Sequence, residues 1–130
     1  MKIEKDILQS GDQYSIRRYG EGHLQINADV ITSSCILTRD QLSTEWPPER
    51  FEQLDTKHLD ALLATEPEVI LIGTGRETRL PSPAMMGHVM RLGVGLECMD
   101  TGAACRTFNI LVGEERRVAA GLFMIEAETN

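Results

Sequence analysis

At residues 69–75 the chain reads Val69-Ile70-Leu71-Ile72-Gly73-Thr74-Gly75. Four consecutive apolar residues bounded by glycine are typical of a strand that is covered on both faces of a sheet. A helix is predicted just before this strand, starting at Asp55 or Thr56 and ending before Pro67, because Asp and Thr cap helices and proline interrupts them. Leucines at positions 59, 62 and 63 give this helix one apolar face.

The alternation of helix and strand continues to the end of the chain. Ser82 followed by Pro83 predicts a second helix, since serine caps a helix and proline suits its first turn. The buried face of this helix is expected to hold four apolar residues, namely Met85, Met86, Val89 and Met90.

A third helix is predicted to begin at Asp100-Thr101 and to bury Ala104, Phe108 and Leu111. It lies between two further predicted strands, Gly95–Met99 and Arg117–Ile125. Helices that alternate with strands in this way favour a largely parallel sheet with helices packed on it.

The N-terminal third of the chain has a different pattern. Residues 14–19 and 23–27 are rich in strand-forming residues, and Gly20-Glu21-Gly22 between them is typical of a hairpin turn. A third strand is predicted over Val30–Thr38, and Trp46-Pro47-Pro48 is expected to be extended. The predicted fold is α/β: a single three-layer domain over residues 1–130, with a central mixed β-sheet, an N-terminal β-meander and about three helices.

The composition restricts the classes of function. A net charge of −7 argues against nonspecific nucleic-acid binding, which depends on clustered Lys and Arg, and pairs such as Arg116-Arg117 are more typical of a solvated face. No apolar run reaches the roughly 18 residues that cross a bilayer. The N-terminus lacks the apolar core of a signal peptide. We therefore expect a cytoplasmic protein with no membrane span and no nucleic-acid partner.

The cysteines and histidines are too scattered to suggest a disulfide framework or a metal site. No Cys-x-x-Cys or His-Glu-x-x-His motif is present, so we expect no metal and no cofactor. Cys35 and Cys98 fall in predicted strands and are expected in the core. Cys105 falls in the first turn of the third helix, where amide dipoles lower a thiol pKa. Redox sensing at Cys105 is one interpretation, and simple packing is the other.

Two segments that leave the predicted parallel strands are candidates for a ligand site, because open α/β sheets bind ligands beyond the carboxyl ends of their strands. In the first, Gly73–Gly75, two glycines allow close approach, and nearby arginines offer charge to a carboxylate or phosphate. In the second, Asp100–Arg106, small residues leave a helix N-terminus uncrowded. The candidate surface comprises ten residues: Gly73, Thr74, Gly75, Arg76, Arg79, Asp100, Thr101, Gly102, Cys105 and Arg106.

Both segments also have a purely structural interpretation. The glycines suit a tight turn, since position 78 is threonine where a dinucleotide fingerprint needs its third glycine, and no P-loop lysine follows. Asp100 is suited to capping the third helix. The small residues at 101–104 suit a helix that packs closely on the sheet.

The sequence resembles the Mth-type domain family in four blocks, Pro67–Gly75, Arg79-Leu80-Pro81, Glu97–Leu111 and Arg116–Ala120. The run Met99-Asp100-Thr101-Gly102-Ala103-Ala104-Cys105-Arg106-Thr107 is the most specific part. The resemblance spans essentially the whole chain. It implies a three-layer domain with a central mixed sheet and an added β-layer, and no established enzymatic activity. Members of this family include a mitochondrial respiratory complex I assembly factor and the adipogenesis-associated Mth-domain protein.

Two functions from different classes are compatible with these observations. The first is a non-enzymatic assembly or accessory factor that acts through protein–protein contacts, favoured by the resemblance and by the lack of a recognised catalytic constellation. The second is a small-molecule binding protein or enzyme that holds an anionic ligand with the Gly73–Gly75 and Asp100–Arg106 loops. The first implies a protein partner and the second a small anionic ligand. Either is expected to be a monomer or a weak homodimer.

Overall fold

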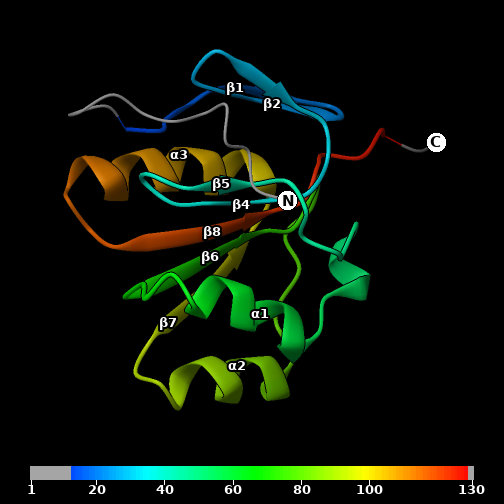
Figure 1. The fold of residues 1–130 in the computed structure, drawn as a ribbon. Coiled ribbons are helices and arrows are strands. Elements are labelled where there is room, and N and C mark those ends of the chain that lie inside the picture. Colours follow the sequence, from blue (N-terminus) through cyan, green and yellow to red (C-terminus); the bar gives the residue numbers. More distant parts are fainter. Residues whose placement is uncertain (1–12, 129–130) are drawn as a thin grey trace.

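A computed structural model, which describes residues 13–128, shows a five-stranded mixed sheet at the centre of the chain (Figure 1). Its strands are β4 (Cys35–Leu37), β5 (Leu42–Ser43), β6 (Val69–Gly73), β7 (Gly95–Met99) and β8 (Val118–Leu122), in the order β5-β4-β8-β6-β7. β6 is parallel to both of its neighbours, whereas β4 is antiparallel to β5 and β8. All residues of β6 and β8 are buried, as the apolar run at 69–72 predicts.

Helices cover both faces of this sheet. α3 (Thr101–Gly113) packs on one face, and α1 (Thr56–Leu63) and α2 (Pro83–Met90) pack on the other (Figure 1). A short 3-10 helix, η2 (Phe51–Gln53), precedes α1. The two faces of β6 therefore belong to two separate apolar cores. No helix within residues 13–128 has the length and apolarity to cross a membrane.

The predicted helix starts are confirmed by their capping contacts. The Asp55 side chain accepts a hydrogen bond from the backbone in a capping box with His58. Ser82 Oγ accepts from the amide of Met85 at 3.1 Å. These local contacts satisfy amide donors that a helix leaves unpaired in its first turn.

A second, three-stranded sheet covers the outer side of α3 (Figure 1). Its antiparallel strands are β1 (Ile16–Gly20), β2 (His23–Ile26) and β3 (Asp29–Ile31). The side chain of Asn109 on α3 joins the layers, because it accepts a hydrogen bond from the Ile16 amide and donates one to the Ile16 carbonyl, both at 2.9 Å. The predicted β-meander is confirmed, and it forms the added β-layer.

The single strand predicted over Val30–Thr38 is wrong, because the chain divides there between two sheets. β3 ends at Ile31 in the small sheet, and β4 begins at Cys35 in the central one. Ser34, between them, is buried, and its hydroxyl donates to the carbonyl of Pro48 at 2.5 Å. This contact fixes the crossing between sheets.

One side chain and one strand boundary also differ from the prediction. Met90 is 60% exposed rather than buried, because it follows the fully buried Val89 and so points about 100° away around the helix. The last strand is shorter than the predicted Arg117–Ile125, since β8 ends at Leu122. Beyond it, Ile125 forms one isolated bridge with Glu21 of the β1–β2 turn.

The only tryptophan of the chain fills the space above a glycine of β8. Trp46 stacks on Phe123 with ring centroids 5.1 Å apart, and its indole nitrogen donates to the carbonyl of His58 at 3.1 Å. A Cβ at Gly121 would lie 2.5 Å from the indole Cη2. Glycine is therefore needed at position 121 to admit the ring.

Candidate functional site

The two predicted strand-end segments lie side by side and are bonded to each other. Gly73 is in register with Met99 across the parallel pair of β6 and β7. The amide of Thr74 donates to the carbonyl of Met99 at 2.8 Å, and the amide of Thr101 donates to the carbonyl of Gly75 at 2.9 Å. The crevice between the carboxyl ends of these strands is thus bridged by the backbone itself.

The side chain of Thr101 completes this closure. It is fully buried, and its hydroxyl accepts a hydrogen bond from the Gly75 amide at 2.8 Å while donating one to the Phe123 carbonyl at 2.7 Å. Thr74 is also buried, and its hydroxyl donates to the carbonyl of Met99 at 3.1 Å. These polar groups are therefore satisfied within the chain.

The two glycines permit contacts with the chain's own residues. A Cβ at Gly73 would lie 3.1 Å from the Cα of Thr101, so the strand end and the helix start are in close contact. Gly75 has φ +105°, a conformation that side chains rarely adopt, and a Cβ there would lie 2.5 Å from Glu126 Oε1. This geometry supports the turn interpretation of Gly73-Thr74-Gly75.

The N-terminus of α3 is capped and covered. Asp100 Oδ1 accepts from the amide of Ala103 at 2.9 Å, which makes Asp100 the N-cap. A Cβ at Gly102 would lie 2.8 Å from Cε1 of Tyr19, so the tyrosine ring of β1 rests on the first turn of the helix. The Asp100 carboxylate and the Tyr19 ring therefore occupy the helix N-terminus, where an anion could otherwise bind.

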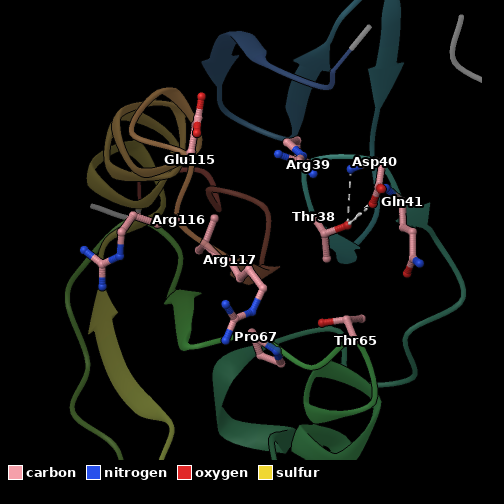
Figure 2. A pocket seen from close by; sticks show the side chains of 10 residues that line it. Thr38, Arg39, Asp40, Gln41, Thr65, Pro67, Glu115, Arg116 and Arg117 are labelled. Carbon is pink, nitrogen blue, oxygen red and sulfur yellow. Dashed lines mark hydrogen bonds between the residues drawn. The ribbon is translucent and has the colours of Figure 1, made fainter. Parts of the chain in front are cut away.

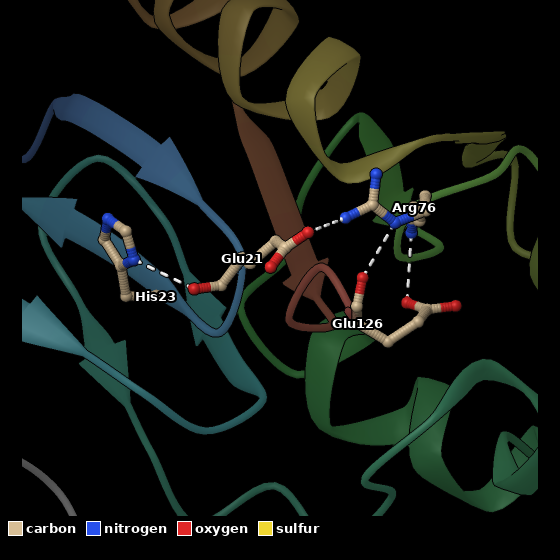
Figure 3. Close-up of polar contacts among 4 residues, drawn as sticks. All are labelled: Glu21, His23, Arg76 and Glu126. Carbon is tan, nitrogen blue, oxygen red and sulfur yellow. Dashed lines mark hydrogen bonds and ion pairs between the residues drawn. The ribbon is translucent and has the colours of Figure 1, made fainter. Parts of the chain in front are cut away.

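The three candidate arginines face separate partners. Figure 3 shows Arg76 between Glu21 of the hairpin turn and Glu126 of the C-terminal segment, where its Nε donates to the Glu126 carbonyl at 2.8 Å. Arg79 Nη1 lies 3.1 Å from the carboxylate of Glu52. These contacts lie within the chain and do not assemble the guanidinium groups around one point.

Arg106, the third, bonds the hydroxyl of Tyr19. Its guanidinium carbon also lies 5.9 Å from the centroid of the Tyr19 ring, a cation–π distance. It therefore binds the small sheet to α3.

The predicted lowering of the Cys105 thiol pKa is wrong. Cys105 is 1% exposed, and burial raises its pKa from 9.0 to about 12, although Arg106 acts in the opposite direction. Cys105 lies in the core cluster that both sheets form with α3, and desolvation there outweighs the helix amides. Burial also raises the pKa of Cys35 to about 12, whereas Cys98 is only half-buried because β7 is an edge strand.

Two of the cavities formed by residues 13–128 contain arginines that the sequence analysis names, and both lie outside the closed crevice. One, of about 180 Å³, adjoins the Gly73 loop and is lined by Glu49, Arg50, Phe51, Glu52, Thr74, Arg79, Phe123, Met124 and Glu126. Only Thr74 and Arg79 of the ten predicted residues line it. Phe51 and Phe123 were missed because each comes from a segment distant from the motif in sequence.

The other cavity, of about 240 Å³, lies at the amino ends of β6 and β8 (Figure 2). It is lined by Thr38, Arg39, Asp40, Gln41, Thr65, Pro67, Glu115, Arg116, Arg117 and Val118. Of the residues that line this cavity, only the Arg116-Arg117 pair is weighed as a binding surface in the sequence analysis. Its lining carries both charges, so it favours no single class of ligand. Within residues 13–128, no three His, Cys, Asp or Glu side chains are grouped to hold a metal ion.

A family model described as "Protein of unknown function (DUF498/DUF598)" matches residues 16–123. The chain is 33% identical over 120 residues to a protein of Francisella tularensis subsp. holarctica (strain LVS) named "13 kDa major membrane protein", covering 92% of this chain and 96% of that protein. It is also 28% identical over 123 residues to NADH dehydrogenase (ubiquinone) 1 alpha subcomplex assembly factor 3 of Xenopus tropicalis. That match covers 93% of this chain but 65% of the longer protein, which is less than two thirds of its length.

The fold is shared with a solved bacterial structure. A Bordetella pertussis protein described as a Mth938-like domain superposes with a TM-score of 0.77 and is 28% identical, with 88% of each chain covered. This likeness confirms the Mth-type α/β fold that the sequence blocks predict.

Proposed function

The chain belongs to the DUF498/DUF598 family of proteins of unknown function, and from this premise we propose that it is a non-enzymatic assembly or accessory factor. It acts through protein–protein contacts, and its proposed location is the cytoplasm. The named assembly factor among its relatives supports a role of this kind for the shared domain.

The observation that carries the proposal is the closed crevice at the carboxyl ends of β6 and β7. An anion bound at this place in an open α/β sheet is held by free amide donors. Here the amides of Thr74, Gly75 and Thr101 bond to the chain's own oxygens. The Gly73-Thr74-Gly75 motif is thus explained by its contribution to the stability of the fold. The outer surface of the domain remains for contacts with a partner.

Affinity capture tests the proposal. The tagged chain, expressed at its native level in its native cells and purified under mild conditions, should retain a partner in a fixed ratio. A matched capture with an unrelated acidic protein of similar size controls for adhesion to negative charge. Repeated recovery of the chain alone would contradict the proposal.

A thermal-shift measurement tests the anionic-ligand alternative separately. Phosphate, nucleotides and dicarboxylates should leave the melting temperature of the chain unchanged. A rise that Arg79→Ala abolishes would instead support ligand binding at the cavity beside the Gly73 loop, since Arg79 lines that cavity.

A further inference from the structure

One edge of the central sheet, formed by β7, is open. Among residues 13–128, β7 stands at the end of the strand order and pairs with β6 alone (Figure 1). At its two ends, the Gly95 amide donates to the Glu68 carbonyl at 3.1 Å and the Met99 carbonyl accepts from Thr74 at 2.8 Å. Because alternate residues of a strand face the same neighbour, Gly95, Glu97 and Met99 bond towards β6.

The residues between them, Leu96 and Cys98, therefore direct their amides and carbonyls away from the sheet. Within residues 13–128 these four groups have no hydrogen-bond partner. The opposite edge differs, since β5 has only two residues. A short edge strand discourages pairing with another chain, whereas the five residues of β7 offer a full template.

The side chains beside this edge are unusual for a solvated surface. Leu96 and Cys98 are half-buried against the core that contains α1 and α2. Leu92, just before β7, is 65% exposed. On the other face, Thr107 of α3 lies 3.5 Å from the sulfur of Met99, and Ile110, one turn further along α3, is 60% exposed. Apolar surface therefore flanks the edge on both sides.

One charged side chain interrupts this apolar surface. Glu97 lies at the centre of β7, is exposed, and forms no ion pair or hydrogen bond through its side chain within the described part of the chain. An unpaired carboxylate in the middle of an edge strand favours a pairing segment with a positive charge opposite it, because oppositely charged cross-strand neighbours stabilise a sheet and like charges destabilise it.

We propose that the β7 edge binds an extended segment of a partner protein as an antiparallel sixth strand. The segment carries a Lys or Arg opposite Glu97, with an apolar residue on each side of it. This inference rests on the proposed function, because it names the surface through which the partner is held. Strand addition of this kind draws affinity from main-chain bonds and specificity from alternate side chains.

A second copy of the chain fits this edge poorly. In an antiparallel β7–β7 pair, the register that bonds all four free groups sets Leu96 opposite Cys98 and Glu97 opposite its own counterpart. The two carboxylate-bearing residues then form a non-hydrogen-bonded pair with Cα atoms about 4.5 Å apart, and the net charge of −7 on each copy adds to this repulsion.

The test uses the ¹⁵N-labelled full chain and a capped peptide, Thr-Val-Thr-Val-Lys-Val-Thr-Val-Thr. The amide signals of Leu96 and Cys98 should exchange faster with solvent than that of Glu97 in the free chain. On titration they should shift and become protected. The same peptide with N-methyl groups on its two central valines should not bind, because it lacks the donors that meet β7.

Two variants separate the charge contribution from the backbone contribution. Glu97→Lys should lower the affinity for the lysine peptide about three- to tenfold and raise the affinity for a peptide with glutamate in place of the central lysine. Cys98→Pro removes an outward amide and leaves the hydrogen-bonding groups that face β6 in place. It should reduce binding of both peptides. Unchanged melting behaviour of Glu97→Lys keeps the result interpretable if Cys98→Pro does not fold.

Three results would overturn the inference. The Leu96 and Cys98 signals could stay in place at millimolar peptide, or the N-methylated peptide could bind equally well. The free chain could also be a dimer in which these two amides are already protected. A partner captured from cells and retained by Glu97→Lys and Cys98→Pro would keep the proposed function and reject this edge as its site.

Discussion

The hydroxyl oxygen of Thr101 lies 2.8 Å from the amide nitrogen of Gly75, and this single contact joins the ends of two parallel strands. The same hydroxyl reaches the carbonyl of Phe123, just beyond β8, at 2.7 Å. One buried oxygen therefore holds together the chain segments that follow β6, β7 and β8. The strand ends form a closed structural joint.

Replacing Thr101 with valine should destabilise the fold strongly. Valine keeps the shape but leaves the Gly75 amide and the Phe123 carbonyl without their partner in a buried place. The expected loss is about 2–4 kcal/mol in the free energy of unfolding, measured by urea denaturation. Thr101→Ser retains the hydroxyl and should lose about 1 kcal/mol or less. Equal losses in both variants would mean that the methyl group, and not the two bonds, stabilises the joint.

Alanine at Gly121 should force the Trp46 ring out of position. We expect about 1–3 kcal/mol of destabilisation from this overpacking and a shift in fluorescence, which reports Trp46 alone because the chain has one tryptophan. Gly113→Ala is the matched control, since a Cβ there meets nothing within 4 Å. In the double variant with Trp46→Leu, the cost of Gly121→Ala should largely disappear, whereas additive costs would show that the ring is not the obstacle.

Alkaline pH should destabilise the chain through Cys105. Its folded pKa of about 12 exceeds the ordinary value of 9.0, so the folded state holds the thiol proton more tightly than the unfolded state. The resulting stability is fully present below pH 9 and is lost as the pH rises towards 12. The stability difference between the wild type and Cys105→Ala should change by about 1.4 kcal/mol per pH unit in this window. A constant difference from pH 8 to pH 10 would show that the thiol ionises freely.

Removing Arg76 should loosen the hairpin from the rest of the domain. Arg76 binds Glu21 in the β1–β2 turn and Glu126 near the C-terminal end. Arg76→Ala therefore removes side-chain contacts that connect the hairpin to the rest of the domain. The global loss should be about 1 kcal/mol or less, with faster hydrogen exchange at the Gly22 amide, which bonds the Ile125 carbonyl at 2.8 Å. Arg79→Ala, which breaks one exposed pair with Glu52, is the control and should leave this amide unchanged.

The parts of the fold that were predicted correctly depend on short-range signals. Asp55 and Ser82 are followed within three residues by the amides or side chains they bond, so each helix start is visible in the sequence. The buried strand at 69–72 was equally clear from its four apolar residues. The break at Ser34 was missed because its cause, the carbonyl of Pro48, lies 14 residues away.

The candidate site shows the same division between local and distant causes. The two strand-end loops face each other because their strands pair in parallel, and the alternation of helices and strands predicts this pairing. The closure of the crevice by Thr101 also depends on Phe123, which lies 22 residues further on. The rise in the Cys105 pKa depends on burial among residues of both sheets, from Ile16 to Leu122, which no pattern around position 105 reveals.

Because α3 packs between two sheets, the small sheet made from the start of the chain is covered only after α3 has been synthesised. The meander is synthesised first, yet Ile16 meets its partner Asn109 only 93 residues later. Until then the apolar face formed by Leu24 and Ile26 has no helix to cover it. The nascent N-terminal third therefore leaves the ribosome before the helix that buries this face, and apolar surface exposed in this way is prone to aggregate.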